Sequence, residues 1–224
     1  MTPAFVGFAV FGFILAAKHF LGGGGVALAF AGNSGDGGGG AGSVPEGTGE
    51  TPTPPPSGVA MQWNNLIAVA AQRAGVDPVL MKAITAVESG FNADSINPER
   101  DFTLDGVDYT QNDRSGRAAL VRWIKDGNDP ASIGLSPSCG MMQIRVSVAK
   151  QLISGLDAWD LFDPATNFEA GSYLAAQMGS LFAVDTADVW NVGAGRNWQN
   201  GMRNIPYRDK VANFYQRFQG DFQS

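Results

Sequence analysis

The sequence predicts a mainly α-helical protein, and three observations support that prediction. Within residues 59–224, apolar residues recur at the spacing of three and four that is typical of helices. No part of the chain shows several runs of alternating apolar and polar residues, as a sheet protein would need. Residues 32–58 are so rich in Gly and Pro that they cannot build a core.

Residues 1–31 form an apolar N-terminal segment. About 20 apolar residues are enough for a helix to cross a bilayer, and residues 4–21 reach that length if Lys18 extends its amine to the interface. The alternative is a secretory signal peptide with Ala29-Phe30-Ala31 before its cleavage site, although a basic start is missing. We therefore expect a transmembrane anchor or a signal-like segment, cleaved or uncleaved.

Residues 32–58 have no apolar periodicity. The Gly-rich half predicts flexible chain, and the TPTPPP run predicts stiff, extended backbone. We interpret these residues as a disordered linker that tethers one folded domain, residues 59–224.

The helices of this domain are expected from periodicity and from signals at their ends. Gly75 follows the first periodic run and Pro78 opens the second, which are common positions for these two residue types. The runs that predict helices are 61–74, 78–89, 114–125, 141–153, 167–181, 186–191 and 207–218.

The composition excludes several classes of function. The chain has one His and one Cys, and His19 lies in the apolar N-terminal segment. Nucleophile systems that need an imidazole base are therefore excluded, as are zinc sites built from His and Cys. A net charge of −6 without basic clusters argues against nucleic acid as a partner. If the domain is an enzyme, carboxylates are left as its acid and base groups, and Cys139 is interpreted as a packing residue.

Glu88 is the carboxylate that the helical pattern selects. Helical spacing puts it on the same stripe as Met81 and Ile84, at the end of the second predicted helix. Partial burial and the negative end of the helix dipole both predict a raised pKa for this carboxyl. A carboxylic acid that stays protonated near neutral pH suits the general acid of glycosidic bond cleavage. The alternative is an ordinary Glu at a helix end, solvated or capped by Ser89.

Two further segments contain residues that suit sugar binding. Residues 140–144 (GMMQI) place a Gly, two Met and a Gln before a helical run, although this pattern fits core packing equally well. Residues 190–195 (WNVGAG) combine an aromatic and an amide side chain with Gly, and a helix C-cap explains the Gly equally well.

The order of these pieces along the chain resembles one enzyme family. The Glu-Ser pair at Glu88 is followed by GMMQI, by N-x-x-A-G-x-Y-L from Asn167, by W-N-x-G-x-G from Trp190 and by P-Y-x-x-K-V from Pro206. Over residues 61–218 this order is similar to that of the lytic transglycosylase domain of the soluble-transglycosylase type. That family is related in fold to goose-type lysozyme, so the resemblance implies a lysozyme-like domain.

The resemblance also implies roles for individual residues. Glu88 matches the catalytic acid of the family. The residues that match its active-site or groove positions, or stand beside them, are Ser89, Met142, Gln143, Trp190, Asn191 and Tyr207. The residues that match its long central helix, and are expected to be structural, are Asn167, Ala170, Gly171 and Tyr173. The family usually has Tyr where Trp190 stands, so the role of that Tyr does not carry over directly.

The largest departure from the family pattern is an insertion at residues 99–137. It contains Asp101, Asp105, Asp108 and Asp113. Several oxygen ligands suit calcium, but this spacing does not match the D-x-D-x-D-G loop. We therefore expect a solvated, charged excursion at the rim of the cleft, and no metal site.

The resemblance implies cleavage of the β-1,4 bond between N-acetylmuramic acid (MurNAc) and N-acetylglucosamine (GlcNAc) in peptidoglycan. The product would be 1,6-anhydro-MurNAc, with Glu88 as the sole acid and base and without a cofactor. Asp94, Asp160 and Asp163 stay open as second carboxylates, and one of them would favour a hydrolytic lysozyme. A catalytically silent peptidoglycan-binding protein of a virus particle is the other alternative.

The expected partners are peptidoglycan glycan strands and, through the N-terminal segment, a membrane. From these partners we predict a membrane-anchored protein whose domain faces the peptidoglycan of the bacterial envelope, or a component of a phage virion. Phage entry, a secretion or conjugation machine, and wall turnover stay open as settings.

Overall fold

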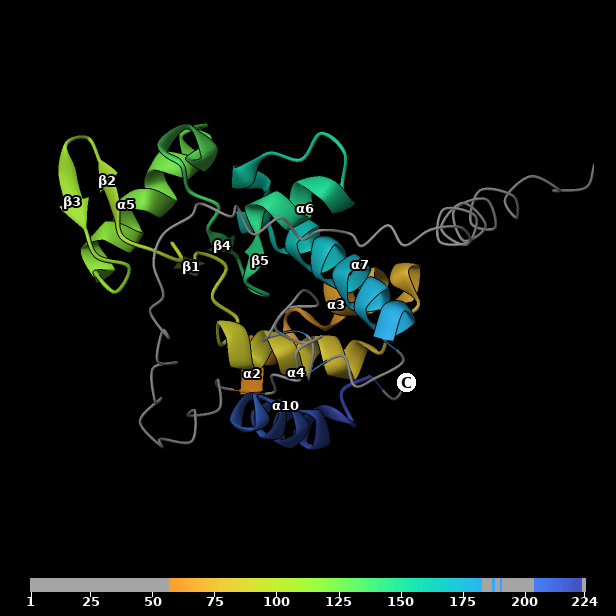
Figure 1. Cartoon of the computed structure of the whole chain (residues 1–224). Helices are drawn as coiled ribbons and strands as arrows, with labels where there is room; N and C mark the ends of the chain where they lie inside the picture. The colour runs from red at the N-terminus through yellow and green to blue at the C-terminus, as the bar shows by residue number, and fades with distance from the viewer. Residues whose placement is uncertain (1–56, 183–186, 188–189, 191–203, 223–224) are drawn as a thin grey trace, which may run out of the picture. The chain divides into compact units, whose positions relative to one another are not determined.

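The part of the chain that the computed structural model describes, residues 57–182, 187, 190 and 204–222, is mainly helical (Figure 1). Its helices are α2 (Ser57–Met61), α3 (Asn64–Ala74), α4 (Pro78–Glu88), α5 (Arg114–Lys125), α6 (Val146–Leu152), α7 (Pro164–Phe182) and α10 (Ile205–Phe218). Two 3-10 helices lie between them, η1 (Pro130–Ile133) and η2 (Ala158–Phe162). The prediction of a mainly α fold is confirmed.

One residue at an end of each of the helices α3, α4 and α5 suits its position, and two of these, Gly75 and Pro78, were expected from the sequence. Asp113 caps α5, because its carboxylate accepts hydrogen bonds from the backbone N–H groups of Ser115 and Gly116. Gly75 ends α3 in the left-handed conformation at φ 70°. Pro78 lies in the first turn of α4, where the missing N–H costs no helical hydrogen bond.

The helix predicted for residues 141–153 is wrong in its first part. Residues 141–143 form a turn and Ile144–Arg145 form strand β5, so that α6 begins only at Val146. Gln143 has a left-handed backbone with φ 51°, and a right-handed helix cannot continue through such a residue. Apolar spacing alone cannot distinguish a short buried strand from one turn of helix.

Two small antiparallel sheets were not predicted. One has the order β1-β4-β5, from β1 (Ile96–Asn97), β4 (Ser138–Cys139) and β5 (Ile144–Arg145). The other is a hairpin of β2 (Phe102–Leu104) and β3 (Val107–Tyr109) within the predicted insertion. Strands of two or three residues contain too little alternation to be recognised in a sequence.

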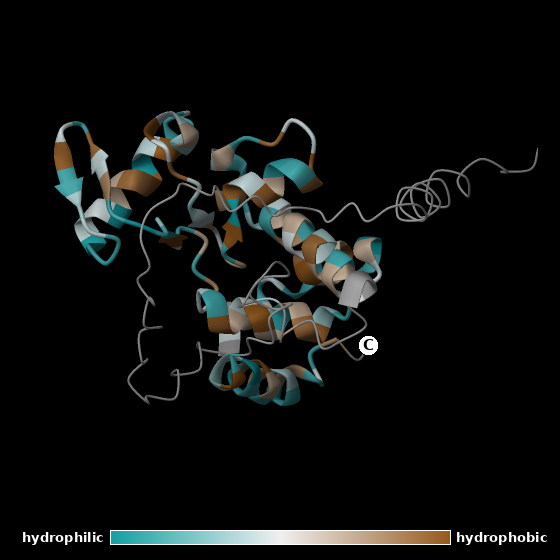
Figure 2. Ribbon diagram, in the orientation of Figure 1, coloured by the Kyte–Doolittle hydropathy of each residue, from teal (hydrophilic) through white to brown (hydrophobic). Residues whose placement is uncertain are grey.

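Helix α4 packs against helices from three other parts of the chain. It contacts α10, α3 and α7, and α3 also packs along α7 (Figure 1). Its buried residues are Met81, Lys82, Ala83, Ile84, Thr85 and Ala86. Figure 2 shows apolar and hydrophilic residues mixed along α10, whose buried residues are Tyr207, Val211 and Phe214. The end of α4 is therefore held by neighbours from distant parts of the sequence.

Helices α4 and α10 run antiparallel to each other. Tyr207 near the start of α10 bonds Glu88 at the end of α4, and Tyr215 near the end of α10 bonds Asp77 just before α4. A fully buried amine, that of Lys82, also ties this pair together. Its Nζ donates to Asn64 Oδ1 at 2.6 Å, pairs with Asp221, and lies 4.6 Å from the ring centroid of Phe218.

The predicted anchor, residues 1–31, lies outside the described residues, as does the linker up to residue 56. Helix α2 begins at Ser57, within the last residues of that predicted linker. None of the helices in the described ranges is long and apolar enough to cross a membrane. The helix predicted for 186–191 also lies outside them, apart from Ala187 and Trp190.

Candidate active site

Glu88 is the last residue of α4, and its side chain is half-buried. The hydroxyl of Tyr207 donates a hydrogen bond to Glu88 Oε1 at 2.7 Å. The side chain of Trp190 forms a second hydrogen bond with the same carboxyl, and an indole N–H can only donate. The structure thus brings together three of the residues that the sequence singled out, Glu88, Trp190 and Tyr207.

The pKa of Glu88 is raised from 4.5 to about 7. Burial is the main cause, because it disfavours the charged form, and it outweighs the lowering by the hydrogen bonds from Tyr207 and Trp190. The negative charge of Glu99 raises the pKa further. At neutral pH this carboxyl is therefore present in both its protonated and its ionised form.

The phenol of Tyr207 keeps its proton in this site. Burial is the main cause that raises the pKa of its hydroxyl well above 10, and the neighbouring Glu88 adds to the effect. Tyr207 is therefore a hydrogen-bond donor to Glu88 over the whole pH range in which Glu88 ionises.

Ser89 connects the end of α4 to the GMMQI segment. Its hydroxyl donates to the backbone carbonyl of Met141 at 2.7 Å. A weaker bond of 3.4 Å goes to the carbonyl of Thr85, one turn earlier in α4. The Ser89 hydroxyl thus bonds two backbone carbonyls, and its contact with glycan stays a prediction.

The turn at Gly140 needs a glycine for two reasons. Its φ is 76°, and a Cβ there would lie only 2.2 Å from the carbonyl oxygen of Leu161 and from Asn167 Nδ2. Asn167 is buried and holds the turn, since its Oδ1 accepts from Met142 N at 2.8 Å and its Nδ2 donates to the carbonyls of Cys139 and Leu161. The structural role expected for Asn167 is confirmed by these contacts.

Met142 does not line a surface groove in the structure. Its side chain is fully buried, and its Sδ packs so closely on Gly171 that a Cβ at that glycine would lie 2.3 Å away. The expected contact of Met142 with glycan is therefore corrected to a core position. Gln143 is half-buried and its Nε2 donates to the carbonyl of Gly140 at 2.8 Å, whereas Asn191 lies outside the described residues.

The sequence reasoning missed a second carboxylate, that of Glu99, whose charge raises the pKa of Glu88. Ser138 Oγ donates to Glu99 Oε1 at 2.5 Å, and Arg145 Nη2 lies 3.5 Å from Glu99 Oε2. The sequence placed Glu99 only at the edge of the predicted insertion. Its partners come from strands β4 and β5, which no local pattern connects to residue 99.

A family model for the transglycosylase SLT domain matches residues 65–206. The chain belongs to this family. The matched range runs from α3 into the first turn of α10 and includes Glu88 and the turn at Gly140. Membership implies peptidoglycan-degrading activity of the lytic transglycosylase type. A comparison with curated proteins finds no match.

The other carboxylates considered for the transglycosylase reaction have local partners. Asp94 forms an ion pair with Lys125, which follows it by 31 residues. Asp160 Oδ2 accepts from the backbone N–H of Asp157, and Asp163 Oδ2 accepts from that of Thr166. These bonds stabilise the ends of η2 and α7.

The acidic insertion of the transglycosylase domain, residues 99–137, contains the β2–β3 hairpin, α5 and η1. Asp101 Oδ1 accepts from the backbone N–H of Gln111, and Asp108 Oδ1 accepts from the hydroxyl of Thr103. Asp113 caps α5. Within the described residues no group of three or more His, Cys, Asp or Glu could hold a metal ion, so the calcium hypothesis has no support there.

Cys139 is a core residue of the transglycosylase domain. It is fully buried, and burial raises the pKa of its thiol far above the usual range. Because the thiolate is the reactive form, this residue is not a nucleophile. The interpretation of Cys139 as a packing residue is confirmed.

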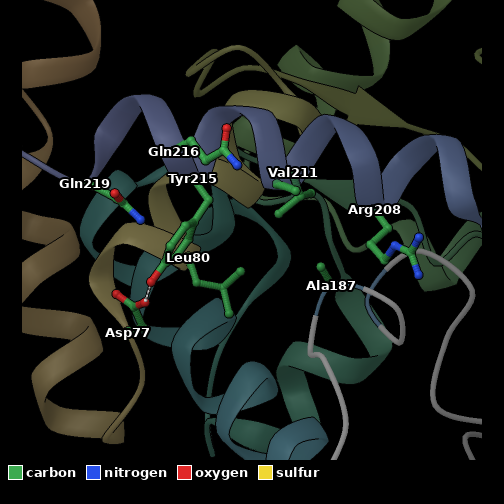
Figure 3. A pocket seen from close by; sticks show the side chains of 9 residues that line it. Asp77, Leu80, Ala187, Arg208, Val211, Tyr215, Gln216 and Gln219 are labelled. Atoms are coloured by element: carbon green, nitrogen blue, oxygen red, sulfur yellow. Dashed lines mark hydrogen bonds between the residues drawn. The ribbon is translucent and has the colours of Figure 1, made fainter.

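A hollow of about 490 Å³ lies along α10, beside the start of α4 (Figure 3). Asp77 and Leu80 line one side, and Arg208, Val211 and Tyr215 line the side formed by α10. The hydroxyl of Tyr215 donates to Asp77 Oδ2 across it at 2.6 Å. Glu88 is not among the residues that line this hollow.

Proposed function

We propose that this domain cleaves the β-1,4 bond between MurNAc and GlcNAc in peptidoglycan and leaves a 1,6-anhydro-MurNAc end. Glu88 acts as the acid and then as the base. The observation that carries the proposal is the half-buried carboxyl of Glu88, whose pKa of about 7 allows both protonation states at neutral pH. Family membership supports the substrate class.

In the first step protonated Glu88 donates its proton to the oxygen between the two sugars. The bond from this oxygen to C1 of MurNAc breaks, and GlcNAc leaves as a free alcohol. Positive charge then develops at C1. In enzymes of this family the acetamido oxygen of the same sugar bonds to C1, so a second carboxylate is not required.

In the second step ionised Glu88 removes the proton from the 6-hydroxyl of MurNAc. The 6-oxygen attacks C1, the 1,6-anhydro ring closes, and the acetamido group is released. Glu88 is protonated again, and no water is consumed. The hydrogen bonds from Tyr207 and Trp190 stabilise the carboxylate that exists between the two steps.

The experiment is digestion of purified peptidoglycan by the wild type and by Glu88→Gln, with release of soluble fragments as the readout. Loss of a general acid and base is expected to reduce the rate by at least about a hundredfold. Glu169→Gln is the matched control, because Glu169 lies on α7 and pairs with Arg73 of α3. Full activity in Glu88→Gln would contradict the proposal. Binding to peptidoglycan without cleavage by the wild type would instead support a silent binding protein.

We also propose that residues 1–58 tether the domain at the bacterial envelope or in a virion. The support is the apolar character of residues 1–31 and the Gly- and Pro-rich residues that follow. Fractionation of the full-length chain and of a chain that begins at residue 57 tests this. Equal amounts of both chains in the soluble fraction would contradict the tether.

A further inference from the structure

The first turn of α10 carries the tyrosine that bonds the acid. Tyr207 is the third residue of this helix, and its hydroxyl donates to Glu88 Oε1 at 2.7 Å. Among residues 205–210 only Tyr207 is buried, and the next buried residue of the helix, Val211, follows one turn later. The packing of this first turn therefore depends on the side chain of Tyr207 itself.

Asn204 caps the same turn. Its Oδ1 accepts a hydrogen bond from the backbone N–H of Tyr207 at 3.1 Å, and its backbone carbonyl accepts from Arg208 N at 3.0 Å. The side chain of a cap residue bonds the N–H of the second or the third helical residue. The second residue here is Pro206, which has no N–H. The order Asn-Ile-Pro-Tyr therefore directs the cap to Tyr207.

Two hydrogen bonds thus act in series on one residue. Asn204 holds the backbone of Tyr207, and the hydroxyl of Tyr207 holds the carboxyl of Glu88. The first N–H groups of a helix have no partners within the helix, and helix ends fray when nothing caps them. The position of the Tyr207 hydroxyl is therefore sensitive to the cap.

The rest of α10 is held by contacts that do not involve Asn204. Val211 and Phe214 are buried against the core. Near the other end of the helix, the hydroxyl of Tyr215 donates to Asp77 Oδ2 at 2.6 Å. Removal of the cap is therefore expected to loosen the first turn and to leave the remainder of α10 packed on α4.

We propose that Asn204 is a positioning residue for glycan cleavage, which fixes the backbone of Tyr207 and so keeps the Tyr207 hydroxyl on Glu88. This inference rests on the proposed function, because it requires Glu88 to be the acid and base. Without the cap, the carboxylate that exists between the two steps loses part of the hydrogen bond that stabilises it. Asn204 acts on the reaction only through Tyr207.

The test is the dependence of kcat/KM on pH. Cleavage needs protonated Glu88, so the rate falls as the pH rises through the pKa of this residue. A hydrogen bond to the carboxylate lowers that pKa, and weakening the bond moves the fall to higher pH. Asn204→Ala is expected to move the fall to higher pH, by less than Tyr207→Phe does. Asn204→Ser keeps an oxygen that can cap the helix, and it is expected to restore the profile of the wild type.

Two further comparisons separate positioning from general loss of stability. Asn204→Ala combined with Tyr207→Phe is expected to move the fall no further than Tyr207→Phe alone, because the cap acts through the missing hydroxyl. Asp113→Ala removes a comparable cap, that of α5, and is the matched control. It should lower the midpoint of urea unfolding and leave the pH profile unchanged. Asn204→Gly also removes the acceptor, and glycine is well tolerated at caps, so this variant replaces Asn204→Ala if the latter does not fold.

A shift in the alanine or glycine variant that disappears in the Tyr207→Phe background and is reversed by Asn204→Ser supports the proposal. An unchanged profile, an equal shift in the Tyr207→Phe background, or the same shift in Asp113→Ala would overturn it. Loss of cleavage in Glu88→Gln would in that case leave the proposed function intact. Full cleavage by Glu88→Gln would overturn the proposed function and the positioning role together.

Discussion

Replacement of Glu88 by Gln is expected to stabilise the folded domain. The pKa of this carboxyl is raised from 4.5 to about 7, so the folded state holds a proton that the unfolded state releases. Between these two values the unfolded state binds fewer protons, and the stability of the wild type therefore falls as the pH rises. Gln carries no charge and is free of this penalty, while its carbonyl still accepts from Tyr207.

The pKa values give the size of the effect. The difference between 7 and 4.5 is about 2.5 units, which at 1.36 kcal/mol per unit sets an upper bound of about 3 kcal/mol. Below the pH at which Glu88 ionises in the unfolded chain, the folded and unfolded states both hold the proton, so this difference in stability vanishes. Above pH 7 it is fully developed. We expect the free energy of unfolding of Glu88→Gln to exceed that of the wild type by roughly 1–3 kcal/mol once the effect is fully developed.

Urea unfolding of the wild type and Glu88→Gln at a series of pH values measures this gain. The same gain in a thermal scan corresponds to roughly 2–4 °C per kcal/mol for a domain of this size. Glu169→Gln is the control and should show no gain that grows with pH. A stability difference for Glu88→Gln that stays constant with pH, or that turns unfavourable above pH 7, would refute the reasoning.

Three further substitutions test the site and the turn that supports it. Cleavage needs protonated Glu88, so kcat/KM should fall as the pH rises through the pKa of this residue. Tyr207→Phe removes a hydrogen bond that lowers this pKa, and the fall should therefore move to higher pH. A move to lower pH would contradict this role. Asn167→Ala removes the side-chain hydrogen bonds of three backbone groups and should cost about 3 kcal/mol in urea unfolding, whereas a loss below about 1 kcal/mol would show that the turn does not depend on it. Gly140→Ala should destabilise by more than about 2 kcal/mol in the same assay, because its Cβ meets a backbone carbonyl at 2.2 Å. Gly127→Ala is its control, since φ is 93° there but no atom lies within 4 Å, and an equal loss in both would contradict the steric argument.

The position of Glu88 could be predicted because the information is local. Met81 and Ile84 are buried on the same helix, and helical spacing alone puts Glu88 beside them. The boundaries of α5 were also predictable, since Asp113 is a strong cap and the run that follows is strongly amphipathic. Both features depend on residues within a few positions of each other.

The features that could not be predicted from the sequence depend on contacts between distant segments of the chain. Glu99 becomes a partner of Arg145 only when β1 and β5 pair with β4, and these strands are too short to be recognised. The side chain of Met142 could line a groove or fill a core, and it is Gly171, on helix α7, that makes room for it in the core. No pattern around residue 142 contains that information.

The mass of the new glycan end, from peptidoglycan digested in water enriched in heavy oxygen, tests the central claim most directly. Glu88 acting as both acid and base closes the 1,6-anhydro ring without water. We therefore expect a muramyl end that is lighter by one water than a hydrolytic end and carries no heavy oxygen. A muramyl end that contains one added water with the heavy isotope would contradict the claim and identify the domain as a hydrolytic lysozyme.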